Sequence, residues 1–406
     1  MSDSPTGPTG ENGDGDSSIQ VFLRCKPIKA VNKWVTTDHE NSRLEFNIPV
    51  AKHIGVDNDR LRNASFQFHG ILDQDCTQAE VFELIAQDCV KSAIQGLNST
   101  IFAYGQTGSG KTYSITGGTR AYEERGIIPR VLTDLFERIE QQSEAKFLVY
   151  ISFLEIYNDR GRDLLNSDML EAQANARRNP GSVSAAGAEA NARKIIVVEG
   201  ETGSIECKNL STHLVTNVED ALNLLFIGDT NREMGSTEMN VQSSRSHCIF
   251  TLNVESRQPG SETIRRAKLN LVDLAGSERV SKSKSKGDRF TEAKHINLSL
   301  HYLQMVIVKL QEKAQGKDVP HIPYRNSMMT SVLRDSLGGN CKTRMCVALW
   351  HKSHCFVHAT HSTHCLWFKA CNSNFASEAL GGNAVDLQIC TVCVPRKAVV
   401  DRMGHI

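Results

Sequence analysis

Residues 105–112 read Gly105-Gln-Thr-Gly-Ser-Gly-Lys-Thr112, and this octapeptide decides the fold. It matches the pattern Gly-x-x-x-x-Gly-Lys-Ser/Thr, whose glycines let several backbone N–H groups converge on phosphate oxygens. In this pattern Lys111 places a cation on the β and γ phosphates, and the Thr112 hydroxyl is a ligand for Mg²⁺. A compact apolar run at 100–104 leads directly into the first glycine. The stretch therefore predicts a phosphate-binding loop between a strand and the start of a helix.

The rest of the chain alternates between strand-like and helix-like patterns. Apolar or β-branched runs predict strands, and apolar residues at helical spacing predict helices. The predicted strands lie at 18–24, 100–104, 147–156, 195–198, 248–254 and 267–274, and the predicted helices at 78–94, 128–139, 218–228 and 291–313. Strands alternating with helices around a phosphate loop indicate an α/β domain, a P-loop NTPase with a central, mostly β-sheet core flanked by helices.

Composition excludes several classes of protein. The chain has 406 residues, of which 40% are hydrophobic and 23% charged, and its formal net charge is zero. These values are typical of a soluble globular protein, in which local basic clusters must attract any acidic partner. No apolar run is long enough to span a bilayer, and we expect neither a membrane nor a nucleic acid as partner. No heptad repeat predicts a stalk, so the oligomeric state stays open.

Two segments differ in composition from the rest. Residues 1–17 are rich in Ser, Gly, Pro and acidic side chains, and they lack the basic start and apolar stretch of a signal peptide. We expect a disordered tail there, and a cytoplasmic chain. Residues 168–194 are rich in Ala, Asn, Ser and Gly, with little that could form a core. This composition predicts a surface insertion in the domain.

A strand that ends in an acid provides a candidate phosphate sensor. Residues 268–279 read Lys-Leu-Asn-Leu-Val-Asp-Leu-Ala-Gly-Ser-Glu-Arg. Asp273, at the end of that strand, is suited to hold the Mg²⁺ shell beside a phosphate loop. The N–H of Gly276 can approach a γ-phosphate because the residue has no side chain. Taken alone, Asp273 would be read as a turn residue, but the nearby phosphate loop favours the functional interpretation.

A second candidate sensor lies at 240–247, which reads Asn-Val-Gln-Ser-Ser-Arg-Ser-His. The hydroxyls of Ser243 and Ser244 are suited to reach Mg²⁺, the γ-phosphate or its attacking water. Arg245 and Glu278 carry opposite charges in the two sensor loops, so their pairing would latch the loops together. The alternative for the serines is a polar loop with capping residues, and for the charges a solvated surface.

The base of the nucleotide is predicted to be adenine. A GTPase of this layout carries an Asn-Lys-x-Asp base reader, and the only Asn-Lys pair here is followed by Trp34 and Val35. Tyr113 directly follows the phosphate loop, and Arg24 and Pro27 lie at the end of the first strand. These side chains are suited to sandwich an adenine by stacking.

Together these stretches resemble the kinesin superfamily. The loop with its lead-in is similar to the kinesin nucleotide loop, the two sensors to its two switches, and Arg24-Cys-Lys-Pro27 to its Arg-x-Arg-Pro. Several motifs in the right order, over about residues 18–345, make the resemblance specific. The matching stretches are 24–27, 103–113, 240–247, 273–278, 321–327 and 335–343.

Finer features resemble the ninth kinesin family. Residues 296–303 read Ile-Asn-Leu-Ser-Leu-His-Tyr-Leu where most kinesins have Asn-Lys-Ser-Leu-Ser-Ala-Leu, and 224–231 and 324–334 point the same way. That family is associated with cilia and flagella. The resemblance therefore implies that the protein is located in the cytoplasm, on the cytoskeleton. The finer resemblance points to the axoneme of a cilium or flagellum.

The resemblance implies ATP hydrolysis with Mg²⁺, stimulated by microtubules and driving movement along them. Thr112 and Ser244 would hold the metal, and positioning and electrostatics would supply most of the catalysis. The implied catalytic residues are Lys111, Ser243, Ser244, Arg245, Asp273, Gly276 and Glu278. The implied ATP-binding residues are Arg24, Pro27, Gly105, Gln106, Thr107, Gly108, Ser109, Gly110, Lys111, Thr112 and Tyr113.

The same resemblance implies a surface that faces tubulin. A lysine run follows the second switch, and a mobile basic loop there would speed encounter with an acidic track. Met328 and Ser331 stand where many transport kinesins have basic residues, which argues against tight binding or long runs. The implied track residues are Lys282, Lys284, Lys286, Tyr324, Arg325 and Arg334.

After Met345 the family pattern is lost, and residues 346–406 are dense in cysteine and histidine. A shifted reading frame or an incorrect gene model is the favoured interpretation, and it would remove a central strand and the neck linker. The function then has an alternative, a non-motor microtubule-binding nucleotide switch or an inactive motor fragment. The other interpretation of the tail is a zinc module formed by Cys355, His364, Cys365, Cys390 and Cys393.

Overall fold

The computed structural model describes ten stretches of the chain, which hold the predicted core. They are residues 19–27, 35–47, 63–118, 121–166, 194–200, 203–234, 245–277, 288–314, 316–337 and 341–349. The predicted tail at 1–17, all but the last residue of the predicted insertion, and the candidate zinc ligands lie outside the described residues. Within these stretches, no helix combines the length and apolar character that a bilayer crossing requires.

A mixed sheet forms the centre of the described structure. Its nine strands there run in the order β11-β7-β12-β13-β6-β14-β1-β5, and β8 pairs with β7. The strands from β13 to β5 are mutually parallel, whereas β12 is antiparallel to both β13 and β7. The strands are β1 (Gln20–Cys25), β5 (Gly70–Leu72), β6 (Asn98–Tyr104), β7 (Lys146–Tyr157), β8 (Arg160–Asp163), β11 (His213–Val215), β12 (His247–Arg257), β13 (Ile264–Asp273) and β14 (Cys341–Leu349).

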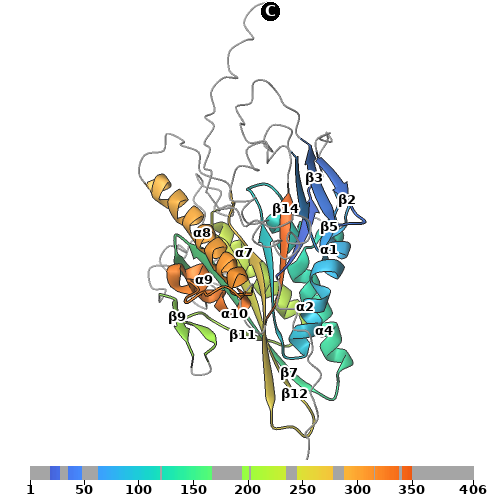
Figure 1. Cartoon of the computed structure of the whole chain (residues 1–406). Coiled ribbons are helices and arrows are strands. Elements are labelled where there is room, and N and C mark those ends of the chain that lie inside the picture. The colour runs from blue at the N-terminus through green and yellow to red at the C-terminus, as the bar shows by residue number, and fades with distance from the viewer. Residues whose placement is uncertain are drawn as a thin grey trace, which may run out of the picture.

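Helices cover both faces of this sheet, as the predicted fold class requires (Figure 1). One face packs against α1 (Gln78–Ile85), α2 (Gln87–Ile94), α4 (Ile127–Gln141) and α7 (Val218–Met234). The other packs against α8 (Asp288–Ala314), α9 (Met328–Val332) and α10 (Arg334–Leu337). The remaining elements are α3 (Lys111–Ile115), η2 (Tyr122–Glu124), η4 (Tyr324–Asn326), a small sheet of β2 (Val35–Asp38), β3 (Arg43–Asn47) and β4 (Asn63–Gln67), and a hairpin of β9 (Ile196–Glu199) and β10 (Ile205–Lys208).

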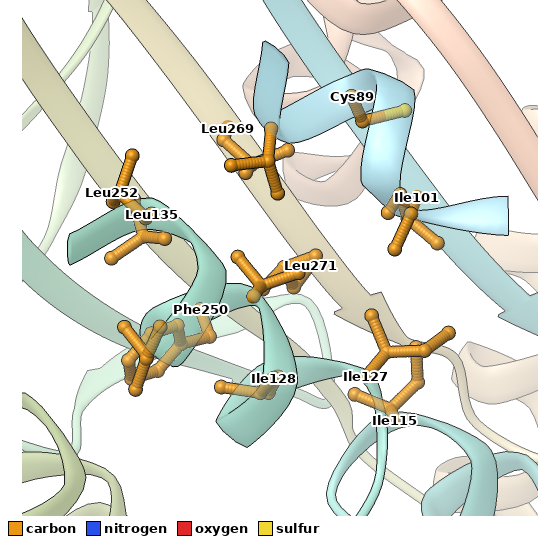
Figure 2. Close-up of a cluster of buried hydrophobic side chains, with 14 of the residues drawn as sticks. Cys89, Ile101, Ile115, Ile127, Ile128, Leu135, Phe250, Leu252, Leu269 and Leu271 are labelled. Carbon is orange, nitrogen blue, oxygen red and sulfur yellow. The ribbon is translucent and has the colours of Figure 1, made fainter. Parts of the chain in front are cut away.

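Strand β6 shows why its sequence suits the middle of the sheet. Side chains alternate between the two faces of a strand. Ile101 and Ala103 therefore join the core under α2 and α4, while Phe102 and Tyr104 join the core under α8. Figure 2 shows Ile101 in the first of these cores, near Cys89 and Leu271. The continuous apolar run of β6 is thus explained by burial on both faces.

The predicted helix at 78–94 is interrupted in the structure. It forms α1 and α2, which meet at Ala86. Arg344 of β14 donates to the carbonyls of Leu84 and Ile85, at 2.7 and 3.1 Å, and to a carboxylate oxygen of Asp88 at 3.0 Å. Because a partner from a distant strand satisfies these carbonyls, the break costs little hydrogen bonding. Helical spacing alone could not predict it.

The expectation that a central strand is missing after Met345 is wrong. Strand β14 runs to Leu349 and lies between β6 and β1, where Val347 is in register with Tyr104 and Leu23. Its residues Cys346 to Ala348 are at most 3% exposed. Cys-Val-Ala-Leu is an apolar run that a strand buried on both faces accepts, whatever family pattern it departs from.

Candidate functional site

The phosphate loop lies between the end of β6 and the start of α3, as predicted. Gly105, Gly108 and Gly110 adopt positive φ values of 150°, 78° and 107°. A Cβ on Gly105 would also lie 2.4 Å from the carbonyl oxygen of Ala348. No other residue type fits Gly105 without displacing β14, so both the loop pattern and the neighbouring strand require glycine there.

Lys111 is enclosed by its own loop. Its ammonium donates to the carbonyl oxygens of Gly105 and Gln106, at 2.9 and 3.1 Å, and the residue is 6% exposed. The cation is therefore held at the centre of the loop rather than in bulk water. A positive charge in this position, beside backbone turned by three glycines, is suited to phosphate oxygens.

Thr112 and Asp273 meet, as the two motifs predict. The Thr112 hydroxyl donates to Oδ2 of Asp273 at 2.8 Å. The other carboxylate oxygen, Oδ1, is buried and has no hydrogen-bond partner among the described residues. A hydroxyl beside a buried carboxylate with spare acceptor capacity is an oxygen donor set that fits Mg²⁺.

Sequence reasoning missed Arg232. Its guanidinium lies 3.2 Å from Asp273 Oδ2, and both side chains are almost fully buried, at 6% and 3% exposed. The helix predicted at 218–228 stops too early to include Arg232, whereas α7 continues to Met234. Burial raises the pKa of neighbouring Asp229 to about 7, although Arg232 opposes that rise. No local spacing pointed to the pair of Arg232 and Asp273, because Asp273 lies 41 positions further along the chain.

The second predicted switch runs beside the phosphate loop. Leu274 N–H donates to the Ala103 carbonyl and Ser277 N–H to the Gly105 carbonyl, each at 3.2 Å. Gly276 lies between these two attachments and is buried. Of the first switch, the described part begins with the half-buried Arg245. Ser243, Ser244 and Glu278 lie outside the described residues, so the predicted latch is not seen.

The residues predicted to flank adenine come together in part. Arg24 lies with its guanidinium carbon 5.3 Å from the centre of the Tyr113 ring. It also donates to Gln78 Oε1 at 2.9 Å and to Ser114 Oγ at 2.8 Å. Gln78, a second residue that the sequence did not reveal, thereby orients Arg24. Tyr113 is 45% exposed, so an open aromatic ring lies beside a fixed guanidinium.

Those residues of the predicted track surface that the structure describes also form a cluster. Arg334 and Arg325 lie 3.1 and 3.7 Å from the same carboxylate oxygen of Glu199, on the β9–β10 hairpin. Together with Tyr324 they line a cavity of about 940 Å³ between that hairpin and α9. Lys282, Lys284 and Lys286 lie outside the described residues. The hairpin and the 324–334 segment, distant in sequence, therefore share one surface.

Comparison with known proteins places the chain in a family. Residues 24–370 match the family model described as the kinesin motor domain. That match continues past Met345, where the resemblance is expected to end, and the interpretation of residues 346–406 as a shifted reading frame or an incorrect gene model stays a prediction. The kinesin-like protein KIF9 of Mus musculus is 40% identical over 326 residues, covering 80% of this chain and 38% of that protein. The kinesin-like protein KLP1 of Chlamydomonas reinhardtii is 34% identical over 335 residues, covering 82% and 40%.

A solved structure has the same fold. It is described as "Structure of a fast kinesin: Implications for ATPase mechanism and interactions with microtubules". It superposes with a TM-score of 0.71 at 29% identity, over 88% of this chain and 92% of that one. The chain thus spans nearly all of that solved structure but only 38% and 40% of the two curated relatives.

Proposed function

Because this chain belongs to the kinesin motor-domain family, whose members are P-loop ATPases, we propose that it hydrolyses ATP faster on a microtubule and moves along it. The observation that carries the proposal is the hydrogen bond between Thr112 and Asp273. It joins the phosphate loop to the strand that leads into the second switch. A group bound at the loop would therefore change the position of the switch directly through this hydrogen bond.

The metal of the proposed reaction is Mg²⁺. Thr112 would bind it through its hydroxyl, Asp273 would hold its water shell, and Ser244 would complete the protein ligands. The buried Oδ1 of Asp273, which has no partner among the described residues, supports this assignment. When bound, Mg²⁺ supplies positive charge that offsets the charge on the β and γ phosphates.

The remaining residues act by position and charge. Lys111 places its ammonium against the β and γ phosphates, replacing the carbonyl contacts it makes to Gly105 and Gln106. Ser243, Arg245 and Glu278 orient the attacking water and its proton path. Gly276 N–H contacts the γ-phosphate and reports its presence to the second switch. Adenine stacks beside Tyr113, over whose ring the Arg24 guanidinium lies.

The track of the proposed motor is the microtubule. The arginines of the 324–334 segment and the lysines at 282–286 supply positive charge on a chain that is neutral overall. Such local clusters of positive charge attract acidic tubulin even though the protein as a whole has no net charge. We place the protein on the cytoskeleton, and the resemblance to the ninth kinesin family favours the axoneme of a cilium or flagellum.

A direct test measures phosphate release with and without polymerised tubulin. The wild-type chain should be stimulated by microtubules, whereas Lys111→Ala should lose about 100-fold or more of the stimulated rate. The exposed Lys91→Ala, on α2, is the control. A wild-type chain that ignores microtubules, or a Lys111→Ala variant with normal turnover, would overturn the proposal. Gliding of filaments over immobilised protein separates a motor from a non-motor nucleotide switch.

A further inference from the structure

The fully enclosed His247 joins three elements that meet beside the phosphate loop. It is the first residue of β12 and the last residue of the predicted first switch, and it is 3% exposed. Its Nδ1 lies 3.0 Å from the backbone nitrogen of Ala275 in the second switch. Its Nε2 lies 2.8 Å from the hydroxyl oxygen of Ser299 on α8. One imidazole at the end of the first switch thus contacts the second switch and the long helix.

The direction of each hydrogen bond follows from the chemistry of the partners. A backbone N–H can only donate, so Nδ1 of His247 must accept from Ala275. In a neutral imidazole the proton then resides on Nε2, which donates to Ser299 Oγ. A protonated imidazole would turn Nδ1–H against the N–H of Ala275 and lose that bond. The geometry therefore requires a single tautomer.

The surroundings keep this imidazole neutral. Burial is the main cause that lowers the pKa of His247 to about 3, and the nearby cations Lys111 and Arg232 lower it further. Both hydrogen bonds accordingly persist with the same polarity over the physiological range. A connection of fixed polarity transmits displacement, because a shift of Ala275 must either move the ring or break a bond.

We infer that His247 is a positioning residue that couples the second switch to α8 through Ser299, so that microtubule stimulation of ATP turnover depends on this connection. The inference rests on the proposed function, and it adds a residue to which that function assigned no role. Ala275 immediately precedes Gly276, the proposed γ-phosphate contact. A displacement of Gly276 therefore reaches α8 through Ala275, the His247 ring and the Ser299 hydroxyl.

A purely structural role for the connection makes a different prediction. Helix α8 is also held by Leu300, Leu303 and Val306, which are buried against the sheet. Removing one hydroxyl should leave that packing in place and the helix docked. Loss of coupling should then appear in the ratio of stimulated to microtubule-free turnover, rather than in thermal stability or in the microtubule-free rate.

The experiment replaces each end of the connection separately. Ser299→Ala removes the acceptor on α8 and should keep microtubule-free turnover within about twofold while lowering the stimulated rate about tenfold. His247→Asn places an amide oxygen near the position of Nδ1 and gives up Ser299. His247→Gln reaches toward Ser299 and gives up Ala275. Each histidine variant should show the same loss of the stimulation ratio.

A double variant and a matched control complete the design. If His247 and Ser299 act as one connection, Ser299→Ala combined with His247→Asn should lose little more than either change alone. Ser92→Ala removes a helical serine of similar burial, 8% exposed against 7%, whose hydroxyl bonds within α2. This control should keep the full stimulation ratio.

The outcomes separate this inference from the proposed function. A wild-type chain without microtubule stimulation overturns the proposed function and the inference with it. A stimulated wild type whose Ser299→Ala variant is stimulated equally overturns the inference alone. Equal loss of microtubule-free turnover, stimulated turnover and melting temperature in Ser299→Ala would assign Ser299 to packing, and would also overturn it.

Discussion

The Thr112 hydroxyl donates to the carboxylate of Asp273 over 2.8 Å, across 161 positions of sequence. The contact is possible because β6 and β13 are parallel neighbours, with Asp273 in register with Ala103. The strand end that carries the acid therefore lies beside the loop that follows β6. The carboxyl ends of parallel strands are where ligands bind in α/β sheets.

We expect Thr112→Val to uncouple nucleotide binding from Mg²⁺. Valine keeps the shape of threonine but lacks the hydroxyl that would bind the metal. Titration of a fluorescent ATP analogue should show tighter binding with Mg²⁺ than with a chelator for the wild type, and about equal binding in both for the variant. Thr112→Ser is the control and should keep the Mg²⁺ effect. Retention of that effect in Thr112→Val would remove Thr112 from the metal site.

The buried pair of Arg232 and Asp273 should be costly to break from one side. Asp273→Asn leaves the Arg232 charge without its carboxylate, and we expect it to lower the free energy of unfolding by about 3 kcal/mol. Adding Arg232→Gln should restore part of this loss because no uncompensated charge is then buried. Chemical denaturation measures both. Strictly additive losses in the double variant would contradict a direct pair.

The Arg334 side chain should contribute to microtubule affinity in a salt-dependent way. It is 25% exposed and lies on the surface shared with the β9–β10 hairpin. We expect Arg334→Gln to weaken co-sedimentation with microtubules by about fivefold at low ionic strength, and less as salt screens the charge. The control is Arg266→Gln, which removes an arginine of β13 that is also paired with a glutamate. An equal effect of both substitutions would point to net charge rather than to this surface.

Strand β14 should be essential to folding, even though its last residues lie beyond Met345, where the resemblance is expected to end. Val347 is 3% exposed between two strands, so Val347→Asp would bury a charge without a partner. We expect the variant to lose several kcal/mol of stability, about the cost of an unpaired buried charge, and to be largely insoluble. Leu148→Asp, at a position 45% exposed, should be tolerated. A soluble, cooperatively unfolding Val347→Asp protein would show that the strand is dispensable.

Mild acid should destabilise the protein through His247. Its pKa is lowered in the folded state from 6.5 to about 3, so between these values the unfolded chain binds a proton that the folded chain does not. Stability is therefore lost as pH falls below about 6.5. From pH 7 to 5.5 the wild type should lose about 1 kcal/mol more than His247→Asn, measured by denaturant unfolding at each pH.

One neighbouring group acts in the opposite direction over the same range. The raised pKa of Asp229, about 7, adds stability as pH falls through that value. Both proteins carry Asp229, so its contribution cancels in the difference between them. Parallel pH profiles for the wild type and His247→Asn would show that the histidine titrates normally in the folded state.

Local chemistry made much of the site predictable. The loop at 105–112 places its glycines, cation and hydroxyl within eight consecutive residues, so its geometry depends little on the rest of the chain. Asp273 was found because an acid ended an apolar strand. The break at Ala86 was missed because Arg344, from another strand, supplies its hydrogen bonds. Strand β14 was missed because departure from a family pattern was taken for loss of a strand.

The sequence by itself determined that the chain carries a phosphate-loop pattern in an α/β domain, since these properties depend on residue types and short spacings. Only the tertiary structure decided which distant group each buried polar side chain takes as its partner. Arg232 pairs with Asp273, and His247 connects Ala275 to Ser299. A buried charge or donor without a partner is costly, so every such group must be matched. The match is set by strand register and helix placement, which spacing along the chain does not record.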